Sequence, residues 1–112
     1  MFKFEIEGNP NDITCRYRIY NHNYTIYLYP SCFSNIEKIP NDLNMLKLYN
    51  NDICPGKLFT IKYDNNTNKM TLITTIKNGF MSKYELYVTD YEYLSFREIL
   101  KELLMYSKSI PS

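Results

Sequence analysis

The strongest constraint on the fold is an alternation of apolar and polar residues with a period of two. At the N-terminus, Phe2, Phe4 and Ile6 alternate with charged residues, which is typical of a strand with one buried face. Four further segments show the same alternation, residues 13–20, 24–29, 57–63 and 70–76. Because the connections between most of them are short and rich in Asn and Gly, neighbouring strands are expected to pair antiparallel.

The link between the second and third of these strands limits how they can pair. A two-residue loop, Asn21-His22, sets Ile19 opposite Tyr24 and gathers the apolar residues on one face. A three-residue loop mixes the two faces and is disfavoured. A four-residue loop has the same parity as the two-residue loop and is the alternative.

After the last of these strands, Asn78-Gly79 is a strong hairpin signal. A two-residue loop would set Leu72 opposite Glu85. A three-residue loop that ends at Gly79 instead sets Leu72 opposite Tyr84, which keeps the apolar residues on one face. The sequence therefore predicts the three-residue loop.

The sequence predicts a helix at the C-terminus and a shorter one near the middle of the chain. Ser95 and Glu98 have the spacing of a capping box, so the C-terminal helix is expected over residues 95–107. Its apolar residues recur with the helical period, and they are Phe96, Ile99, Leu100, Leu103 and Tyr106. Asn41 or Asp42 can cap the shorter helix over residues 41–49, within a segment whose pattern is otherwise irregular.

Together these elements predict an α+β protein, with a mostly antiparallel β-meander sheet of about six strands and a C-terminal helix packed on one face. The alternative is a small barrel capped by the C-terminal helix. The chain has 112 residues, with no internal repeat and no linker. Residues 1–112 are therefore expected to form a single domain.

Charge and hydropathy disfavour several classes of protein. Thirteen basic and twelve acidic residues leave a net charge of +1, which argues against a strongly basic nucleic-acid binder. No apolar run approaches the roughly 18 residues of a membrane span, so no membrane association is expected. Charges at alternate N-terminal positions are unlike the apolar core of a signal peptide.

Residues that carry catalytic or metal chemistry are sparse. The cysteines, Cys15, Cys32 and Cys54, form no Cys-x-x-Cys pair, and His22 is the single histidine. Because zinc needs about four closely arranged N or S ligands, we expect no metal. Nucleophilic catalysis needs a positioned base beside the nucleophile, and His22 lies in a predicted turn, so we expect no cofactor and no enzymatic activity. Cys15 lies on an apolar strand face and is expected to be buried. Cys32 and Cys54 are expected to be thiols or, in an oxidising compartment, to form a disulfide.

Three surfaces are candidates for partner binding. One strand face interleaves arginine with tyrosine, which is typical of protein interfaces and also suits stacking on single-stranded nucleic acid; its residues are Arg16, Arg18, Tyr20, Tyr27 and Tyr29. Two polar loops form the second candidate, with Asn50, Asn51, Asp52, Asn65, Asn66 and Asn68. The third is an apolar stripe on the sheet face away from the helix, with Leu58, Ile73, Met81 and Tyr87.

The composition indicates a low-GC genome, such as that of a virus, a phage, a mollicute or a parasite. The chain has no Ala, Gln or Trp but 13 Asn and 12 Tyr, and the favoured residues share AT-rich codons. Codon bias explains the dispersed Asn. It explains Tyr20, Tyr27 and Tyr29 least, because these tyrosines lie on the polar side of their strands.

Three segments carry a resemblance to a known family, the run Tyr24–Cys32, the corner Cys54-Pro55-Gly56 and the stretch Asn66–Asp90. Together they resemble small secreted phytoplasma effectors of the proteasome-adaptor type, which bridge the proteasomal ubiquitin receptor to zinc-finger transcription factors. The resemblance implies a non-enzymatic adaptor whose partners are host proteins, including a proteasomal receptor and a transcription factor. It also implies secretion into the host cell or its cytoplasm; without it, a cytoplasmic protein is expected.

The sequence therefore predicts a protein–protein interaction module of a pathogen or virus, an effector that binds host proteins and redirects or inhibits them. The alternative is a single-stranded nucleic-acid-binding protein. Nucleic acid is the less expected partner, because the positive and negative charges nearly cancel.

Overall fold

The computed structural model describes residues 1–9, 14–33, 39, 45–50, 57–75 and 81–109. The elements in these ranges are, in order, β1 Lys3–Glu7, β2 Arg16–Tyr20, β3 Thr25–Leu28, the 3-10 helix η1 Pro30–Cys32, β4 Met45–Asn50, β5 Lys57–Asp64, β6 Lys69–Thr75, β7 Met81–Tyr87 and α1 Asp90–Ser109. Every strand pair in this set is antiparallel. The predicted α+β fold with antiparallel strands and a C-terminal helix is confirmed.

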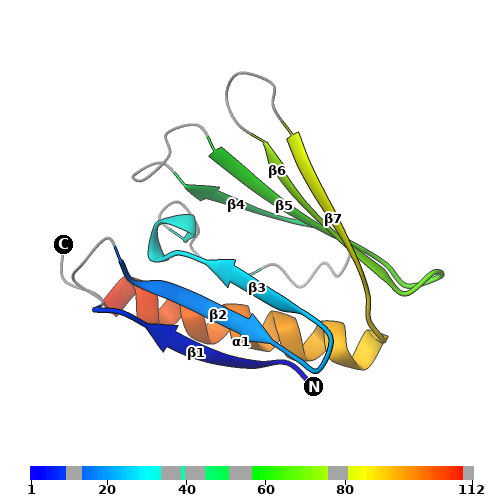
Figure 1. Ribbon diagram of the computed structural model, residues 1–112, viewed down its shortest axis with the longest axis horizontal. Helices are drawn as coiled ribbons and strands as arrows, with labels where there is room; N and C mark the ends of the chain where they lie inside the picture. Colours follow the sequence, from blue (N-terminus) through cyan, green and yellow to red (C-terminus); the bar gives the residue numbers. More distant parts are fainter. Residues whose placement is uncertain (10–13, 34–38, 40–44, 51–56, 76–80, 110–112) are drawn as a thin grey trace.

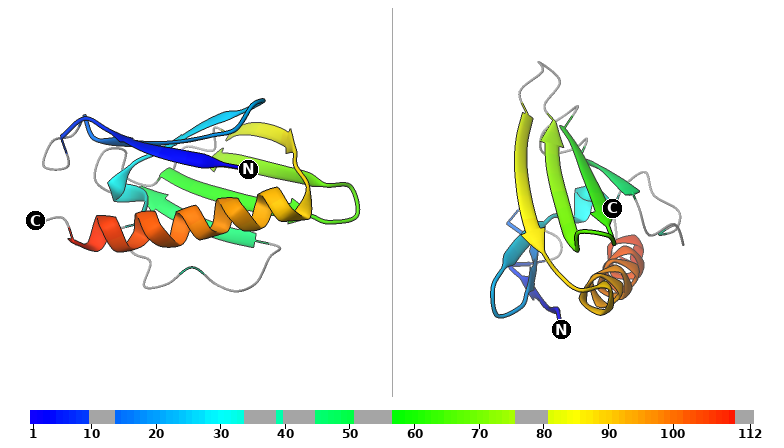
Figure 2. Two further views of the ribbon diagram at one scale, coloured as in Figure 1. Left: turned by 90° about the horizontal axis from the view of Figure 1, so that it is seen from below. Right: turned by 90° about the vertical axis from the view of Figure 1, so that its right-hand side faces the viewer.

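The strands divide between two sheets. β1, β2 and β3 form a three-stranded sheet in this order, and β4 to β7 form a four-stranded meander. The helix lies along one face of the three-stranded sheet, and the four-stranded sheet is inclined to both (Figure 1). The views in Figure 2 show two open sheets in the described part of the chain, so the barrel alternative is not supported.

The core is centred between the three-stranded sheet and α1. Alternation along β2 turns Tyr17 and Ile19 towards the helix, and both are fully buried. Burial of a side chain such as Ile19 contributes roughly 1.5–3 kcal/mol. Edge-on ring contacts join Phe2 to Phe96 and Tyr17 to Tyr106 across the layers. The buried apolar residues of α1 recur at helical spacing, as Tyr93, Phe96, Ile99, Leu100, Leu103 and Leu104.

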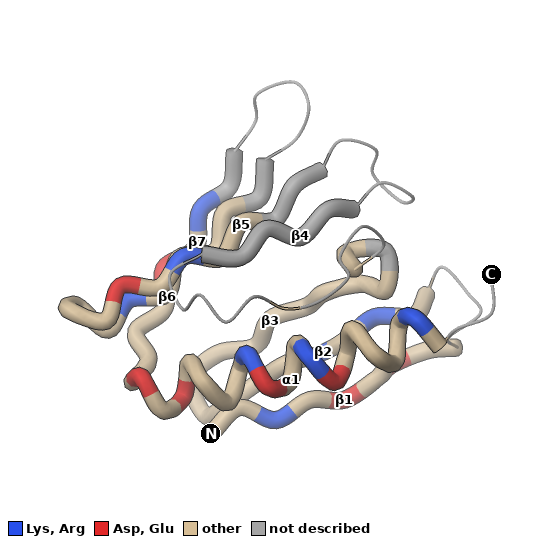
Figure 3. The backbone as a smooth tube through the Cα atoms, turned by 180° about the vertical axis from the view of Figure 1, so that it is seen from behind, with Lys and Arg blue, Asp and Glu red and all other residues tan. Residues whose placement is uncertain are grey.

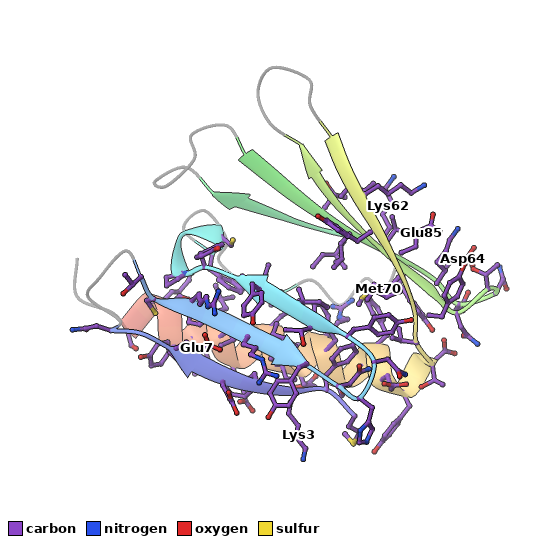
Figure 4. All side chains as sticks on the ribbon, viewed as in Figure 1. Lys3, Glu7, Lys62, Asp64, Met70 and Glu85 are labelled. Carbon is purple, nitrogen blue, oxygen red and sulfur yellow. The ribbon has the colours of Figure 1, made fainter. Side chains whose placement is uncertain are left out.

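One face of the four-stranded sheet extends this core. The strand register places Ile61, Tyr63 and Met70 on that face, and all three are buried in the same apolar cluster as the first sheet and α1. Figure 4 shows Met70 on the side towards the helix layer, and Lys62 and Glu85 on the opposite side. A single buried cluster therefore includes both sheets and the helix.

The first hairpin forms in the alternative register. Ile19 lies opposite Ile26 and not opposite Tyr24, so the two-residue loop is wrong and the four-residue loop of the same parity is correct. The side-chain oxygen of Asn21 accepts hydrogen bonds from the backbone N–H groups of Asn23 and Tyr24, at 2.9 and 2.8 Å. These two bonds stabilise the longer turn, in the way that Asn side chains commonly do.

The register of the second hairpin is confirmed. Leu72 lies opposite Tyr84, and Met70 lies opposite Leu86. Its predicted loop lies outside the described residues. The apolar pattern alone was sufficient here, because a shift of one residue would have moved every apolar side chain to the other face.

The helix begins earlier than predicted. The N–H of Glu92 donates to the hydroxyl of Thr89 at 3.2 Å, and the N–H of Tyr93 donates to the Thr89 carbonyl. Ser95 is therefore not the cap: inside the helix, its hydroxyl donates to the Glu92 carbonyl and accepts from the N–H of Phe2. Thr89 and Glu92 have the same capping-box spacing, and the longer helix also buries Tyr93.

The helix predicted over residues 41–49 is wrong in the part that the structure describes. Met45–Asn50 forms β4, and Leu46 lies opposite Ile61 of β5. Pairing with β5 supplies partners for backbone N–H and C=O groups, and a short helix has little stability of its own. The contact with a distant strand therefore outweighs the local preference.

Candidate functional site

The outer face of the three-stranded sheet carries charged and aromatic side chains that contact one another. Alternation along β2 turns Arg16, Arg18 and Tyr20 to this face, because Tyr17 and Ile19 point into the core. Figure 1 shows α1 on the other face of the sheet and no described element over this one. These side chains are therefore available to a partner.

Arg16 is held between a carboxylate and an aromatic ring. Its Nε donates to Glu7 at 2.8 Å, and its guanidinium lies over the ring of Tyr27, 4.2 Å from the centroid. The hydrogen bond to Glu7 raises the pKa of Arg16. The side chain of Arg16 is still 43% exposed, so it is oriented without being covered.

Arg18 repeats this arrangement one pair further along the strand. Its Nη1 lies 3.3 Å from Glu5, and its guanidinium lies over the ring of Tyr20 at 4.0 Å. The hydroxyl of Tyr20 donates to the other carboxylate oxygen of Glu5 at 3.3 Å. Glu5, Arg18 and Tyr20 therefore hold one another in place, and all three stay at least partly exposed.

Strand register explains both ion pairs and the contact of Arg16 with Tyr27. Tyr20 instead lies two residues from Arg18 on the same face of β2. β1 sets Glu7 opposite Arg16 and Glu5 opposite Arg18, and β3 sets Tyr27 opposite Arg18. Opposite and diagonal neighbours on one sheet face are within reach of long side chains. Our sequence reasoning missed the two glutamates, although the alternation of residues 2–7 places both on the polar side. The Arg–Tyr face, as defined here, consists of Glu5, Glu7, Arg16, Arg18, Tyr20 and Tyr27.

Tyr29 was predicted for the same face and lies at its border. It follows the end of β3, is half-buried and packs against the core. The electrostatic effect of Tyr29 on Arg16 is a minor contribution to the raised pKa of that guanidinium. Tyr27, at 39% exposure, is the more accessible of the two rings.

The predicted loop residues do not form one site. Asn50 ends β4 beside the start of β5, whereas the other described loop residues follow the far end of β5, as Asn65, Asn66 and Asn68. The eight residues of β5 separate these ends by roughly 25 Å. The predicted positions outside the described residues are Asn51 and Asp52.

The predicted apolar stripe is interrupted by charges. Register places Ile73 between Thr60 and Lys83 on the outer face of the four-stranded sheet. Ile73 is half-buried, and Tyr87 on the same face is 60% exposed. The strand register assigns the positions of two further predicted residues to the same face, Leu58 and Met81.

Glu85 lies among these residues with two lysines beside it. Its carboxylate is 3.3 Å from the amine of Lys83 and 3.7 Å from that of Lys69. The hydrogen bond from Lys83, together with the charge of Lys69, lowers the pKa of Glu85. The outer face of the four-stranded sheet is therefore mixed in character.

A cleft of about 530 Å³ lies between β3 and the four-stranded sheet. β3 forms one wall, and Ile61, Leu72 and Tyr84 contribute to the other. Tyr84 is 62% exposed. The hydroxyl of Tyr24 accepts a hydrogen bond from the N–H of Tyr87 at 3.1 Å, which links the two sheets beside the cleft. Sequence reasoning missed this cleft, because the two sheets meet through residues far apart in the chain.

The described residues bear on the predictions for metal and for the cysteines. They contain no group of three His, Cys, Asp or Glu side chains that could hold a metal ion. Burial raises the pKa of the Cys15 thiol, which lowers its reactivity at neutral pH. Cys32 is buried, and Cys54 lies outside the described residues, so the disulfide between them stays a prediction.

No described helix is both long and apolar enough to cross a membrane. Comparison of the chain with protein-family models, with curated proteins and with solved structures finds no match.

Proposed function

We propose that this protein is a non-enzymatic protein-binding module and that the Arg–Tyr face contacts its partner. The observation that supports this most strongly is the fixed position of two partly exposed arginines, each ion-paired to a glutamate and stacked on a tyrosine. Arginine and tyrosine dominate the binding energy of many protein interfaces. Side chains that are already ordered lose less conformational entropy on binding.

The same contacts favour a protein over single-stranded nucleic acid. Glu7 and Glu5 largely neutralise Arg16 and Arg18, whereas single-strand binding needs a groove with an excess of positive charge. Figure 3 shows acidic residues beside the basic ones along β1, β2 and α1, without a continuous basic track in the described part of the chain. Arginine also covers one side of the Tyr20 and Tyr27 rings, which leaves less ring surface for bases.

The partner surface that fits this face has hydrogen-bond acceptors and an apolar centre. A guanidinium has five N–H donors, and the ion pair between Arg16 and Glu7 engages Nε. The other donors can reach carboxylates or backbone carbonyls of a partner. The exposed part of Tyr27 supplies the apolar contact.

A narrower role is proposed on the strength of the sequence resemblance. In it, the protein is a secreted effector of a low-GC pathogen and acts in the host cell or its cytoplasm. It binds host proteins and redirects or inhibits them, as an adaptor between a proteasomal receptor and a transcription factor. The Arg–Tyr face supplies the protein contact that this role requires.

The test compares Arg16→Gln/Arg18→Gln with the wild type. Immobilised protein is incubated with plant lysate, and quantitative mass spectrometry identifies the captured proteins. A purified candidate is then titrated by calorimetry. We expect the double variant to bind it at least tenfold more weakly, since truncating one interface hot spot costs about 2 kcal/mol or more. The thermal midpoint should change little, because exposed ion pairs contribute roughly 0–1 kcal/mol each.

The matched control is Glu98→Gln/Lys101→Gln, which removes an exposed ion pair of 3.0 Å on α1. It should bind like the wild type. Equal binding by all three proteins would contradict the proposal. A labelled thymidine oligonucleotide is titrated in parallel at about 50 mM salt, where single-strand binders bind most tightly. Tight binding there, lost in the arginine variant, would favour the nucleic-acid alternative instead.

A further inference from the structure

Within the described part of the chain, β7 has an unpaired edge at the border of the four-stranded sheet. The order β4-β5-β6-β7 leaves one side of β7 without a strand. Figure 2 shows that much of this strand has no described element beside it. An open edge of this kind can pair with another strand unless its side chains prevent it.

Two hydrogen bonds show which residues of β7 point their backbone groups outwards. The N–H of Val88 donates to the carbonyl of Asn68, the residue before β6, so the backbone groups of Val88 point towards β6. The N–H of Tyr87 donates away from β6, to the hydroxyl of Tyr24. Because the direction alternates along a strand, the N–H and C=O groups of Lys83 and Glu85 also point outwards.

We propose that this edge pairs with the same edge of a second copy of the chain, as an antiparallel β7–β7 dimer with a two-fold axis beside Tyr84. Lys83 of each copy then lies opposite Glu85 of the other. The outward backbone groups of these residues form four hydrogen bonds across the axis. The two meanders become one eight-stranded sheet.

Charge selects this register. Outward-pointing residues must lie opposite one another to exchange backbone hydrogen bonds, which leaves three registers near the middle of the strand. Two of them set Lys83 opposite Lys83, or Glu85 opposite Glu85, and like charges directly opposite are destabilising. The third sets Lys83 opposite Glu85 twice. The edge is thus self-complementary in only one of these registers.

The same register brings two exposed rings together. Tyr84 lies on the two-fold axis, opposite its own copy, in a non-hydrogen-bonded pair where side chains are closest. Tyr84 is 62% exposed in the monomer. The hydroxyl of Tyr24 occupies the N–H of Tyr87, so the pairing ends at Lys83 and Glu85. The interface is short, and the expected dimer is in the micromolar range or weaker.

This dimer does not depend on the proposed function. It uses the β7 edge, whereas the Arg–Tyr face belongs to β1, β2 and β3. The two surfaces can therefore be tested separately. If both hold, a dimer presents two Arg–Tyr faces to its partner.

Sedimentation equilibrium of the purified protein, from about 10 μM to about 1 mM, tests the proposal. The wild type should approach twice the 13.5 kDa mass of one chain. Lys83→Glu and Glu85→Lys should each raise the dimer dissociation constant at least tenfold, because each places two like-charged pairs across the axis. The double variant Lys83→Glu/Glu85→Lys restores opposite charges and should dimerise again.

Mixing the two single variants gives a second and sharper test. Each single variant should be mostly monomeric alone. In a mixed dimer, the Lys83→Glu chain has acidic side chains at positions 83 and 85, and these lie opposite the basic side chains at positions 85 and 83 of the Glu85→Lys chain. The mixture should therefore sediment as a dimer. Circular dichroism of each variant checks that it is folded. A monomeric wild type at about 1 mM, or folded single variants that show no recovery on mixing, would overturn the proposal.

A backbone variant separates strand pairing from a contact by side chains. Glu85→Pro removes an outward N–H that the protein's own sheet does not use, and edge strands tolerate proline in this position. Glu85→Gln removes the charge alone. We expect the proline variant to dimerise at least tenfold more weakly than the glutamine variant. Equal dissociation constants for the two would exclude pairing through the edge.

Discussion

Tyr63 of β5 stacks on Tyr93 of α1, with ring centroids 4.1 Å apart and planes 11° from parallel. The hydroxyl of Tyr63 donates to a carboxylate oxygen of Asp90, in the first turn of α1, and lies 3.3 Å from the carbonyl of Val88. Tyr63 thus joins the four-stranded sheet to the start of the helix through both its ring and its hydroxyl. The two parts of this contact can be separated by mutation.

We expect Tyr63→Phe to lower the free energy of unfolding by about 1–2 kcal/mol, because it keeps the stack and removes the hydrogen bond. Tyr63→Ala should lower it by about 3–5 kcal/mol, because it also leaves a cavity in the core. Urea denaturation followed by circular dichroism measures both. Equal losses in the two variants would show that the stacked ring contributes nothing.

Alkaline pH should destabilise the protein through its buried tyrosines. Burial raises the pKa of Tyr17 to about 12, and burial with the hydrogen bond to Asp90 raises that of Tyr63. An unfolded tyrosine ionises near pH 10, so the unfolded chain loses these protons first. The stabilising effect is complete below about pH 10 and declines as the pH rises towards 12.

Urea midpoints measured between pH 7 and pH 12 check this expectation. The decline due to Tyr17 alone should reach roughly 2–3 kcal/mol, and Tyr17→Phe should flatten that part of the profile. The absorbance of tyrosinate at 295 nm reports the ionisation itself. Tyr17→Phe with an unchanged pH profile would show that this hydroxyl does not govern alkaline unfolding.

Gly8 should not tolerate a side chain. Its φ of +79° lies in the left-handed region, and a Cβ would lie 2.8 Å from the backbone oxygen of Thr14. Gly8→Ala is expected to cost about 2–3 kcal/mol, from the conformation and the clash together. Asn68, with φ of 55°, is the control, since Asn68→Gly should change stability by no more than about 1 kcal/mol. A neutral Gly8→Ala would contradict the close approach to Thr14.

Cys15 should resist alkylation while the protein is folded. It is 1% exposed, and burial raises its pKa, so both access and the thiolate population are reduced. Iodoacetamide at pH 8, followed by peptide mass spectrometry, should label Cys15 at least tenfold faster in 8 M urea than in buffer. Equal rates would contradict its place in the core. The same peptides, prepared without reductant, show whether Cys32 and Cys54 are bonded.

Much of the fold was predictable from alternation. The inward positions Phe2, Tyr17 and Ile19 are buried, as are Met70 and Leu86 of the second hairpin. The alternation of apolar and polar residues was enough to place these side chains, because a strand has only two faces and one of them is apolar. The first hairpin shows the limit of this reasoning, since two loop lengths have the same parity and Asn21 decides between them.

The site was predictable in part. The arginines and Tyr27 lie together on the outer face, but their fixed positions depend on Glu5 and Glu7 of another strand. β4 could not be predicted, because it forms through pairing with β5 and not through its own pattern. The start of α1 was ambiguous, since Thr89 and Ser95 both begin a capping box.

By itself, the sequence determined the faces of most strands, the presence of the C-terminal helix and the balance of charge on the polar side. These properties are local, since they depend on the period of two or 3.6 residues within one segment. Only the tertiary structure decided that the strands divide into two sheets, that Tyr63 stacks on the helix and that β7 has an open edge. Such features depend on which distant segments meet, and many arrangements of the same strands bury the same apolar faces.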